Sequence, residues 1–170
     1  GVAVLQLIKE AKDNNSTEID LYNKNITDAA PLKFLTNLEK LSIDSNNISD
    51  ISFLSNLKNL TYLELDQNQI SDISVLSKLP NLTNLWIGQN NLLDFSALSS
   101  LINLVGLSMI DCNISVLNPL TGLNNLETLY LYNNPITKSQ KAMLEEALPN
   151  TTIYWPDEII DDRTWDEKYE

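Results

Sequence analysis

Leucine recurs every 22 residues through most of the chain, at Leu38, Leu60, Leu82, Leu104, Leu126 and Leu148. Around the first five of these positions the frame L-x-x-L-x-L-x-x-N returns, with Ile, Met or Cys replacing a few of its members. A unit of this length cannot bury its apolar side chains alone, so neighbouring units must stack into a solenoid in which each unit contacts only the next. The repeat therefore predicts an elongated protein in which any functional site lies on a surface.

Each unit predicts one short strand followed by one turn. In Leu41-Ser42-Ile43 and its equivalents, apolar and polar residues alternate, which is typical of a strand with one face in the core. The next segment is too short for an α-helix. An Asp and a Ser at its start, such as Asp50 and Ser52, predict a capped 3₁₀ turn on the convex side. The expected strands lie near residues 18–22, 40–44, 62–66, 84–88, 106–110, 128–132 and 151–154.

An asparagine closes the frame of most units, and Cys112 replaces it in one of them. An Asn amide donates and accepts hydrogen bonds at once, so the repeated amides should bind backbone groups of their own and the neighbouring unit as a ladder. We expect Cys112 to be a buried structural thiol. The predicted ladder consists of Asn46, Asn68, Asn90, Cys112 and Asn134.

The unit length of 22 and the phrase Asp-Ile-Ser, which begins at Asp50 and at Asp72, resemble the leucine-rich repeats of bacterial internalins and of the related phosphatase-regulator type. The resemblance covers residues 17–155. It implies an α/β fold, a right-handed solenoid with a curved parallel sheet of about seven strands, 3₁₀ turns on the convex side and helical caps at both ends. It also implies protein binding without catalysis.

Both ends depart from the repeat, as the terminal units of a solenoid must if they are to be soluble. Apolar residues at helical spacing in residues 2–13 predict an amphipathic helix that covers the first unit. Near the other end, Thr137 and Gln140 are spaced as a capping box, and the helix 138–148 should end before Pro149. The predicted domains are an N-terminal cap at 1–16, repeats with the C-terminal helix and last strand at 17–155, and an acidic tail at 156–170.

The predicted positions of the last strand and of the tail depend on the spacing after Leu148. Thr151 and Ile153 lie three and five residues after it, which predicts that the seventh strand keeps the register of the repeat. Counted this way, Tyr154 stands beside Tyr132. The tail is expected to be solvated or loosely docked; in the alternative, its large apolar side chains pack on the last unit. Those side chains are Ile159, Ile160 and Trp165.

The composition excludes several classes of function. A net charge of −12, from 23 acidic and 11 basic residues, disfavours nucleic acid and anionic membranes as partners. The chain has no apolar run of 18 residues, so no membrane insertion is expected. It has no histidine and a single cysteine, which removes the commonest general base and metal ligand and leaves no internal disulfide. We therefore expect no enzyme activity, no metal and no cofactor.

Two kinds of side chain divide the outward face of the predicted sheet. The N-terminal units carry acids, whereas the C-terminal units carry uncharged aromatic and apolar residues at positions that are normally polar. An exposed apolar patch marks interaction sites, and Trp and Tyr are enriched among binding hot spots. In the alternative, these aromatics only reflect strand propensity. The predicted partner-binding residues are Tyr62, Trp86, Ile110, Tyr130, Tyr132, Tyr154, Asp44, Glu64 and Asp66.

The expected function is a non-catalytic binding module that holds a protein or peptide on its concave face. Aromatic residues would anchor the partner, Gly88 and Gly106 would leave room for its side chain against Trp86, and the acidic half would select a basic segment. We expect a monomer that is secreted or on a bacterial surface rather than cytoplasmic. One alternative is a structural spacer within a larger protein. The other is a glycan hydrolase using Glu64 and Asp66, which an open sheet disfavours because it does not desolvate a carboxylate.

Overall fold

The structure is a computed structural model and describes residues 2–161. In chain order its elements are α1 (Val2–Asp13), β1 (Glu18–Asp20), η1 (Ala30–Phe34), β2 (Lys40–Ser42), η2 (Ser52–Asn56), β3 (Tyr62–Glu64), η3 (Ser74–Lys78), β4 (Asn84–Trp86), η4 (Ser96–Ser100), β5 (Gly106–Ser108), η5 (Asn118–Leu120), β6 (Thr128–Tyr130), α2 (Lys138–Ala147) and β7 (Thr152–Tyr154). The elements marked η are 3₁₀ helices. None of the helices in the described range is long and apolar enough to cross a membrane.

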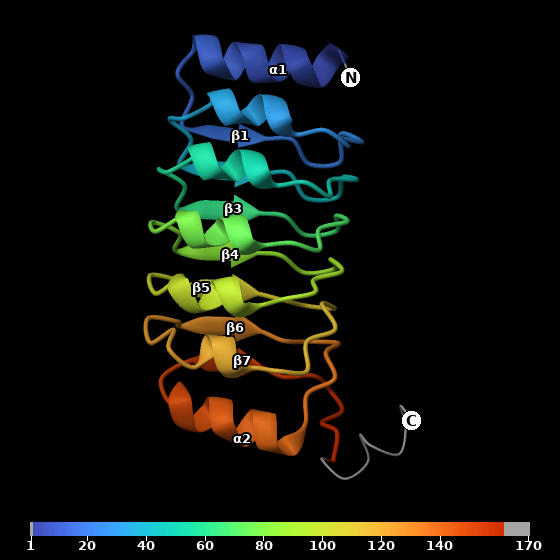
Figure 1. The fold of residues 1–170 in the computed structure, drawn as a ribbon, viewed down its shortest axis with the longest axis vertical. Coiled ribbons are helices and arrows are strands. Elements are labelled where there is room, and N and C mark those ends of the chain that lie inside the picture. Colours follow the sequence, from blue (N-terminus) through green and yellow to red (C-terminus); the bar gives the residue numbers. More distant parts are fainter. Residues whose placement is uncertain (1, 162–170) are drawn as a thin grey trace.

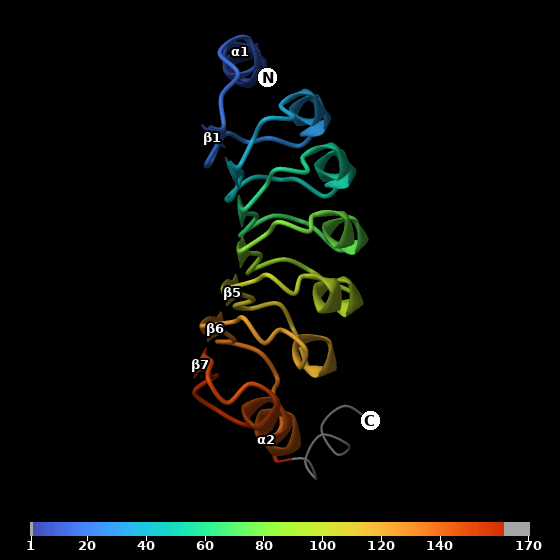
Figure 2. The ribbon, with the colours of Figure 1, turned by 90° about the vertical axis from the view of Figure 1, so that its left-hand side faces the viewer.

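The strands form one seven-stranded parallel sheet in chain order. Figure 1 shows the units stacked along the long axis, with α1 at one end and α2 near the other. In Figure 2 the strands line the concave side and the 3₁₀ helices line the opposite, convex side. From β1 to β6 each strand pairs with the next at an offset of 22 residues, as Leu41 does with Leu63. The predicted leucine-rich repeat solenoid is thus confirmed.

The strands are three residues long, shorter than predicted, because regular pairing ends where the chain begins to turn toward the convex side. Hydrogen bonds between units nevertheless continue past each strand. The N–H of Ile43 donates to the carbonyl of Glu64 at 3.0 Å, and the N–H of Ser45 donates to that of Asp66 at 2.9 Å. The alternation of inward and outward residues therefore continues past the end of the strand: Ile43 is fully buried, and Asp44 after it lies on the outward side.

A single apolar core runs through the whole length of the solenoid. Leu41, Leu63 and Leu85 are fully buried, each between the residues above and below it. Full burial of such a side chain contributes about 1.5–3 kcal/mol. Since each unit supplies only one layer of this core, its stability depends on the units on either side.

A hydrogen bond from backbone to Asp begins each regular convex turn. Oδ1 of Asp50 accepts the N–H of Ser52 at 2.8 Å, and the same bond recurs at 2.8 Å in the next two units, at Asp72 and Asp94. This bond lowers the pKa of Asp50 below its ordinary value. The Asp and Ser of the repeat thus start the 3₁₀ helix that the sequence predicts.

The ladder asparagines are buried and bind backbone groups of two units. Nδ2 of Asn68 donates to the carbonyls of Ile43, Leu65 and Asp66 at 3.0, 3.1 and 3.2 Å. Its Oδ1 accepts the N–H of Ile48 at 3.0 Å. Equivalent sets of bonds are made by Asn46, Asn90 and Asn134.

Cys112 occupies the ladder position between Asn90 and Asn134 and is fully buried. Its thiol donates to the carbonyl of Ile87 at 3.3 Å. Burial raises the pKa of Cys112 to about 12, so the thiol stays protonated and unreactive at neutral pH.

A second asparagine ladder, which the sequence analysis missed, runs along the opposite margin of the sheet. Its members precede the anchor leucines, and each Nδ2 donates to a backbone carbonyl 23 residues earlier. The distances lie between 2.8 and 3.2 Å. The signal was present in the sequence as an Asn directly before each anchor leucine from Leu38 to Leu126. The second ladder consists of Asn59, Asn81, Asn103 and Asn125.

In each unit, the residue directly before the member of the first ladder has a left-handed backbone conformation. The φ angle is 56° at Ser45, 54° at Gln67 and 53° at Gln89. A side chain makes this conformation costly for residues other than Gly and, to a lesser degree, Asn. The solenoid therefore holds several residues in an unfavourable conformation to make its turns.

The two α-helices cover the ends of the core. In α1, Ile8 and Ala11 are buried against the first unit. At the start of α2, Oγ1 of Thr137 accepts the N–H of Gln140 at 3.3 Å. The side chain of Gln140 does not complete the predicted capping box; its Oε1 accepts the N–H of Leu117 at 2.8 Å. Gln140 thus ties α2 to the preceding unit.

The predicted register of the last strand was wrong by two residues. Ile153 pairs with Leu129, and Tyr154 pairs with Tyr130 rather than with the predicted Tyr132. The reason is that α2 replaces the short turn and uses more chain to cross the convex side. Because the extra length is an even number of residues, the alternation of inward and outward side chains is kept.

Residues 156–161 fold back against the last unit. The N–H of Ile160 donates to the carbonyl of Ile136 at 2.9 Å, and its carbonyl accepts the N–H of Lys138 at 3.0 Å. Ile159 is partly buried against the core. Trp165 and the rest of the predicted acidic tail lie outside the described residues.

Candidate protein-binding face

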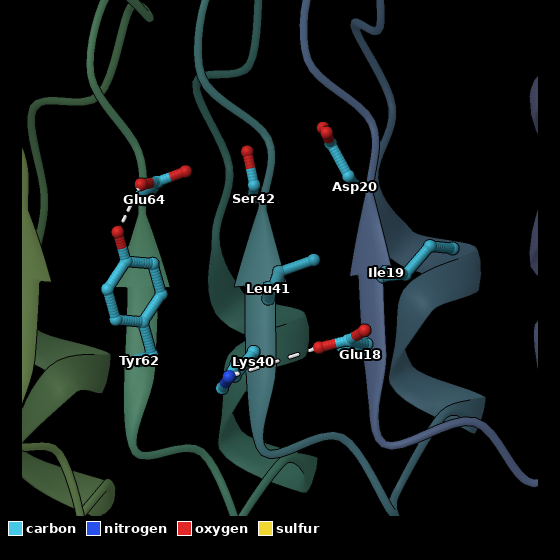
Figure 3. Close-up of a pocket in the computed structure, with 8 residues that line it drawn as sticks. All are labelled: Glu18, Ile19, Asp20, Lys40, Leu41, Ser42, Tyr62 and Glu64. Carbon is cyan, nitrogen blue, oxygen red and sulfur yellow. Dashed lines mark hydrogen bonds and ion pairs between the residues drawn. The ribbon is translucent and has the colours of Figure 1, made fainter.

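A groove of about 430 Å³ lies on the concave face over β1, β2 and β3 (Figure 3). Three of its lining residues are acids. The cation beside them is Lys40, whose Nζ lies 4.0 Å from the carboxylate of Glu18, and both side chains are mostly exposed. Such a pair is weak, so the groove keeps a negative potential. The acidic groove, as we call it, is lined by Glu18, Ile19, Asp20, Lys40, Leu41, Ser42, Tyr62 and Glu64.

Asp44 and Asp66 lie beside the acidic groove, two residues after its members Ser42 and Glu64. The hydroxyl of Ser42 donates to Asp44 at 2.7 Å. The N–H of Gly88 donates to Asp66, which is half-buried. Burial raises the pKa of Asp66 to about 6, and the charges of Asp44 and Glu64 act in the same direction against the bond from Gly88. Asp66 therefore changes charge close to neutral pH.

Tyr62 and Trp86 form the border between the acidic and the aromatic parts of the face. Their ring centroids lie 5.6 Å apart with the planes tilted by 46°. The hydroxyl of Tyr62 donates to the carboxylate of Glu64. Burial and this hydrogen bond raise the pKa of Tyr62 to about 12. Tyr62 thus contacts the acids through its hydroxyl, while Trp86 lies on the uncharged side of the face.

The space beside Trp86 is filled by the protein itself, which corrects the expectation that two glycines leave room for a partner. A Cβ atom added at Gly106 would lie 2.9 Å from Cη2 of Trp86, so the indole ring covers this glycine. A Cβ atom added at Gly88 would lie 3.2 Å from Oδ1 of Asp66. Gly106 is required by the side chains of Asn84 and Trp86 on the neighbouring strand. At Gly88 the closest obstacle is backbone, because an added Cβ atom would lie 2.9 Å from the carbonyl oxygen of Ile110.

Three tyrosines gather at the C-terminal end of the face, and we call them the tyrosine cluster. Tyr130 and Tyr154 stack with centroids 4.7 Å apart and planes inclined by 8°. Tyr132 meets Tyr154 at 6.1 Å and 43°. Tyr132 and Tyr154 remain 36% and 38% exposed. The cluster therefore offers ring surface and hydroxyl groups to solvent, with the partly exposed Ile110 in the unit before it.

The predicted partner-binding residues thus fall into two groups on one face. The first joins Asp44, Glu64 and Asp66 to the Tyr62–Trp86 pair, and the second is the tyrosine cluster, with Ile110 in the unit before it. Glu18 and Asp20 also line the acidic groove, although they are not among the predicted partner-binding residues. They were recognisable, because they precede Lys40 and Ser42 by one period of 22 and so extend the same outward columns.

The chemistry of this face suits contact with a cationic and partly apolar surface. Carboxylates accept hydrogen bonds from guanidinium and ammonium groups, and exposed rings contact apolar or cationic side chains. Among residues 2–161, no group of His, Cys, Asp or Glu is arranged to hold a metal ion.

Comparisons with known proteins agree with this architecture. A family model described as leucine-rich repeats, in two copies, matches residues 17–56 and 58–100. No curated protein matches the chain. An internalin of Listeria monocytogenes (InlF) has a TM-score of 0.68 and 28% identity over 93% of this chain and 57% of its own. Internalin C2 of the same species has a TM-score of 0.65 and 25% identity over 91% of this chain and 84% of its own.

A leucine-rich repeat protein of Leptospira interrogans shares the fold, with a TM-score of 0.63 and 23% identity over 77% of this chain and 40% of its own. The chain spans little more than half the length of the first internalin, 57%. The repeat frame, the seven-stranded solenoid and these matches agree with one another. The chain is thus a leucine-rich repeat solenoid that is similar to bacterial internalins.

Proposed function

We propose that this domain is a non-catalytic binding module that holds a protein or peptide on its concave face. Solenoids of this kind present extended concave surfaces to partners. The observation that carries the proposal is the division of the face. Acids line β1 to β3, whereas the large outward side chains from β4 onward are uncharged, namely Trp86, Ile110, Tyr130, Tyr132 and Tyr154.

Charge and aromatic surface would have separate roles in binding. The acidic groove and the neighbouring Asp44 and Asp66 would attract a basic segment and favour it over neutral ones. Trp86 and the tyrosine cluster would supply the contact area that slows dissociation. The partner is therefore expected to carry Lys or Arg next to apolar or aromatic residues.

We assign no catalytic role to the carboxylates of this face. Glu64 accepts the hydroxyl of Tyr62, and Asp66 accepts the N–H of Gly88. Both lie on an open sheet, which forms no enclosed site and does not exclude water from the carboxylates. Internalin-like neighbours also favour a secreted or surface-exposed protein over a cytoplasmic one.

A selection from random twelve-residue peptides displayed on phage would test the proposal. Peptides enriched on the immobilised domain should be rich in Lys or Arg and in aromatic residues. Their binding should fall at least tenfold for Trp86→Ala. The matched control is Ile102→Ala, which removes a side chain that is 58% exposed away from the sheet. The proposal is wrong if selected peptides bind Trp86→Ala as tightly as the parent but lose binding to Ile102→Ala.

A further inference from the structure

The acidic groove and the tyrosine cluster lie a fixed distance apart on one rigid sheet. The groove is centred on β2, and the cluster lies on β6 and just beyond it and on β7. Neighbouring parallel strands are about 4.8 Å apart, so the four to five strand steps between the two correspond to about 20 Å. Any single segment that contacts both must cover this distance.

The surface between them is continuous and uncharged. The ring of Trp86 covers Gly106 on β5. Ser108, whose register neighbours are Trp86 and Tyr130, is only 6% exposed. All outward residues of β4 to β7 are within the described range, and none of them is charged. A segment that leaves the acidic groove therefore crosses the Trp86 ring and then other uncharged surface until it reaches the tyrosine cluster.

The acidic groove is suited to one basic side chain. Asp20 and Glu64 contribute carboxylates that Lys40 does not neutralise, since the pair that it makes is with Glu18. Tyr62 lines the same groove, so a guanidinium there can meet both a carboxylate and the face of a ring.

We propose that one extended segment of the partner lies along the solenoid axis, with an Arg or Lys in the acidic groove and an aromatic or proline side chain on the tyrosine cluster, about six residues apart. This inference rests on the proposed function and adds the conformation and spacing of the segment. An extended chain advances about 3.3 Å per residue, so six residues match the distance of about 20 Å.

The relief of the face favours an extended segment over a helix. The Tyr62–Trp86 pair stands between the acidic groove and the rest of the path. A helix is about 10–12 Å across with its side chains, so one resting on this pair would hold its axis well above the groove. An extended chain is narrower, and extended proline-rich segments are known to dock in aromatic-lined grooves.

Rigid peptide rulers would test the spacing. Each carries one arginine and one tryptophan, separated by three, six or ten prolines, which hold the ends apart at about 3.1 Å per residue. A fourth ruler uses a thirteen-residue helical spacer, which covers about 20 Å at 1.5 Å per residue. Binding to the full chain is measured by NMR titration of backbone amides. We expect the six-proline ruler to bind at least tenfold more tightly than the three- and ten-proline rulers, and at least fivefold more tightly than the helical one.

Paired substitutions in the chain and in the ruler would test which end binds where. Glu64→Gln should weaken the six-proline ruler about tenfold, and should have no further effect when the arginine is replaced by glutamine. Tyr154→Ala should behave in the same way toward the tryptophan. Leu93→Ala, which removes an exposed side chain elsewhere on the solenoid, should change neither.

Three results would overturn the inference: equal binding of all rulers, tighter binding of the helical ruler, or coupling of Glu64 to the tryptophan. Its failure can be told from failure of the proposed function. If phage-selected peptides lose binding to Trp86→Ala while the rulers bind alike, the concave face binds partners but not in this arrangement. If Trp86→Ala leaves the selected peptides unaffected, both proposals are wrong.

Discussion

The side chain of Asn134 binds the backbone of Cys112: its Oδ1 accepts the N–H of Cys112 at 3.1 Å as well as that of Ile114 at 3.0 Å. In a regular unit the ladder side chain accepts one such N–H. The extra bond accompanies a left-handed φ of 56° at Asn113. The same arrangement recurs at the other unit without a ladder Asn, where Asn46 accepts the N–H of Lys24 at 3.0 Å and the next residue has a φ of 54°. A missing ladder amide is thus compensated by the asparagine of the next unit.

This relationship predicts that the ladder positions differ in their contribution to stability. Asn134→Ala removes five hydrogen bonds to buried backbone and should lower the free energy of unfolding by about 2–3 kcal/mol. Asn68→Ala, which removes four, should cost about 1–3 kcal/mol. Cys112→Ala should cost less than either. Urea unfolding followed by circular dichroism would measure all three, and equal midpoints for the parent and Asn68→Ala would exclude the ladder as a source of stability.

The left-handed residues offer a stabilising change. Gln89 has a φ of 53° and an exposed side chain, so Gln89→Gly should relieve backbone strain. Glycine also makes the unfolded chain more flexible, which offsets part of this effect. The net increase in the free energy of unfolding should be about 0.5 kcal/mol. Gln89→Ala is the matched control, since it removes the side chain but keeps the Cβ atom. Thermal unfolding should rank Gly above Ala, and the opposite order would contradict the assignment of strain.

Asp66 should make stability depend on pH in an unusual direction. Its pKa is about 6 in the folded protein, above the ordinary value of 3.8. Between these two pH values the folded state binds more protons than the unfolded state, so this group makes the free energy of unfolding fall as the pH rises. Asp66→Asn should remove that component and be more stable than the parent at pH 7.5 by about 1–2 kcal/mol, allowing for solvent screening.

The measurement is urea unfolding of the parent and of Asp66→Asn at pH 4.5 and 7.5. The advantage of the variant should shrink at the lower pH, where the parent is largely protonated. The lowered pKa values of Asp50, Asp72 and Asp94 act in the opposite direction and at lower pH, because their stabilisation is lost as the pH falls below the ordinary value of 3.8. A difference between the two proteins that does not change with pH would show that Asp66 is not the titrating group.

Binding should respond differently to the aromatic and acidic residues. With a peptide from the display selection, Trp86→Ala, or Tyr130→Ala combined with Tyr132→Ala, should weaken affinity by about 2 kcal/mol, mainly through faster dissociation. Because Trp86 also covers Gly106, circular dichroism must first show that the variant is folded. Loss of affinity through slower association alone would contradict the role of the rings as anchors.

Neutralising Asp44 and Asp66 together should slow association and flatten its dependence on salt, with little change in dissociation. Surface-based kinetics at two ionic strengths would measure this. If association keeps the salt dependence of the parent, the acids do not steer the partner.

Periodicity determined which parts of the structure the sequence predicted. The frame around Leu41 and its equivalents predicted the strands, the inward leucines and the register of β1 to β6, because each unit repeats the same local environment. The register failed after α2, where Tyr154 pairs with Tyr130, since a single irregular connection has no repeat from which to count it. The same limit applies to Gly106, because which side chain covers a glycine depends on rotamers that spacing does not encode.

The two asparagine ladders fasten each unit along both margins of the sheet, as at Asn68 and Asn81. The same ladder bonds join each unit to the next, so an additional unit of the same kind could be inserted between two existing ones. Duplicating the unit around β4 would move the tyrosine cluster one strand step, about 4.8 Å, away from the acidic groove without altering either. In an extended partner that shift equals about one and a half residues. In the proposed arrangement, gain or loss of a whole repeat would change the spacing that the face selects while every recognition residue stays the same.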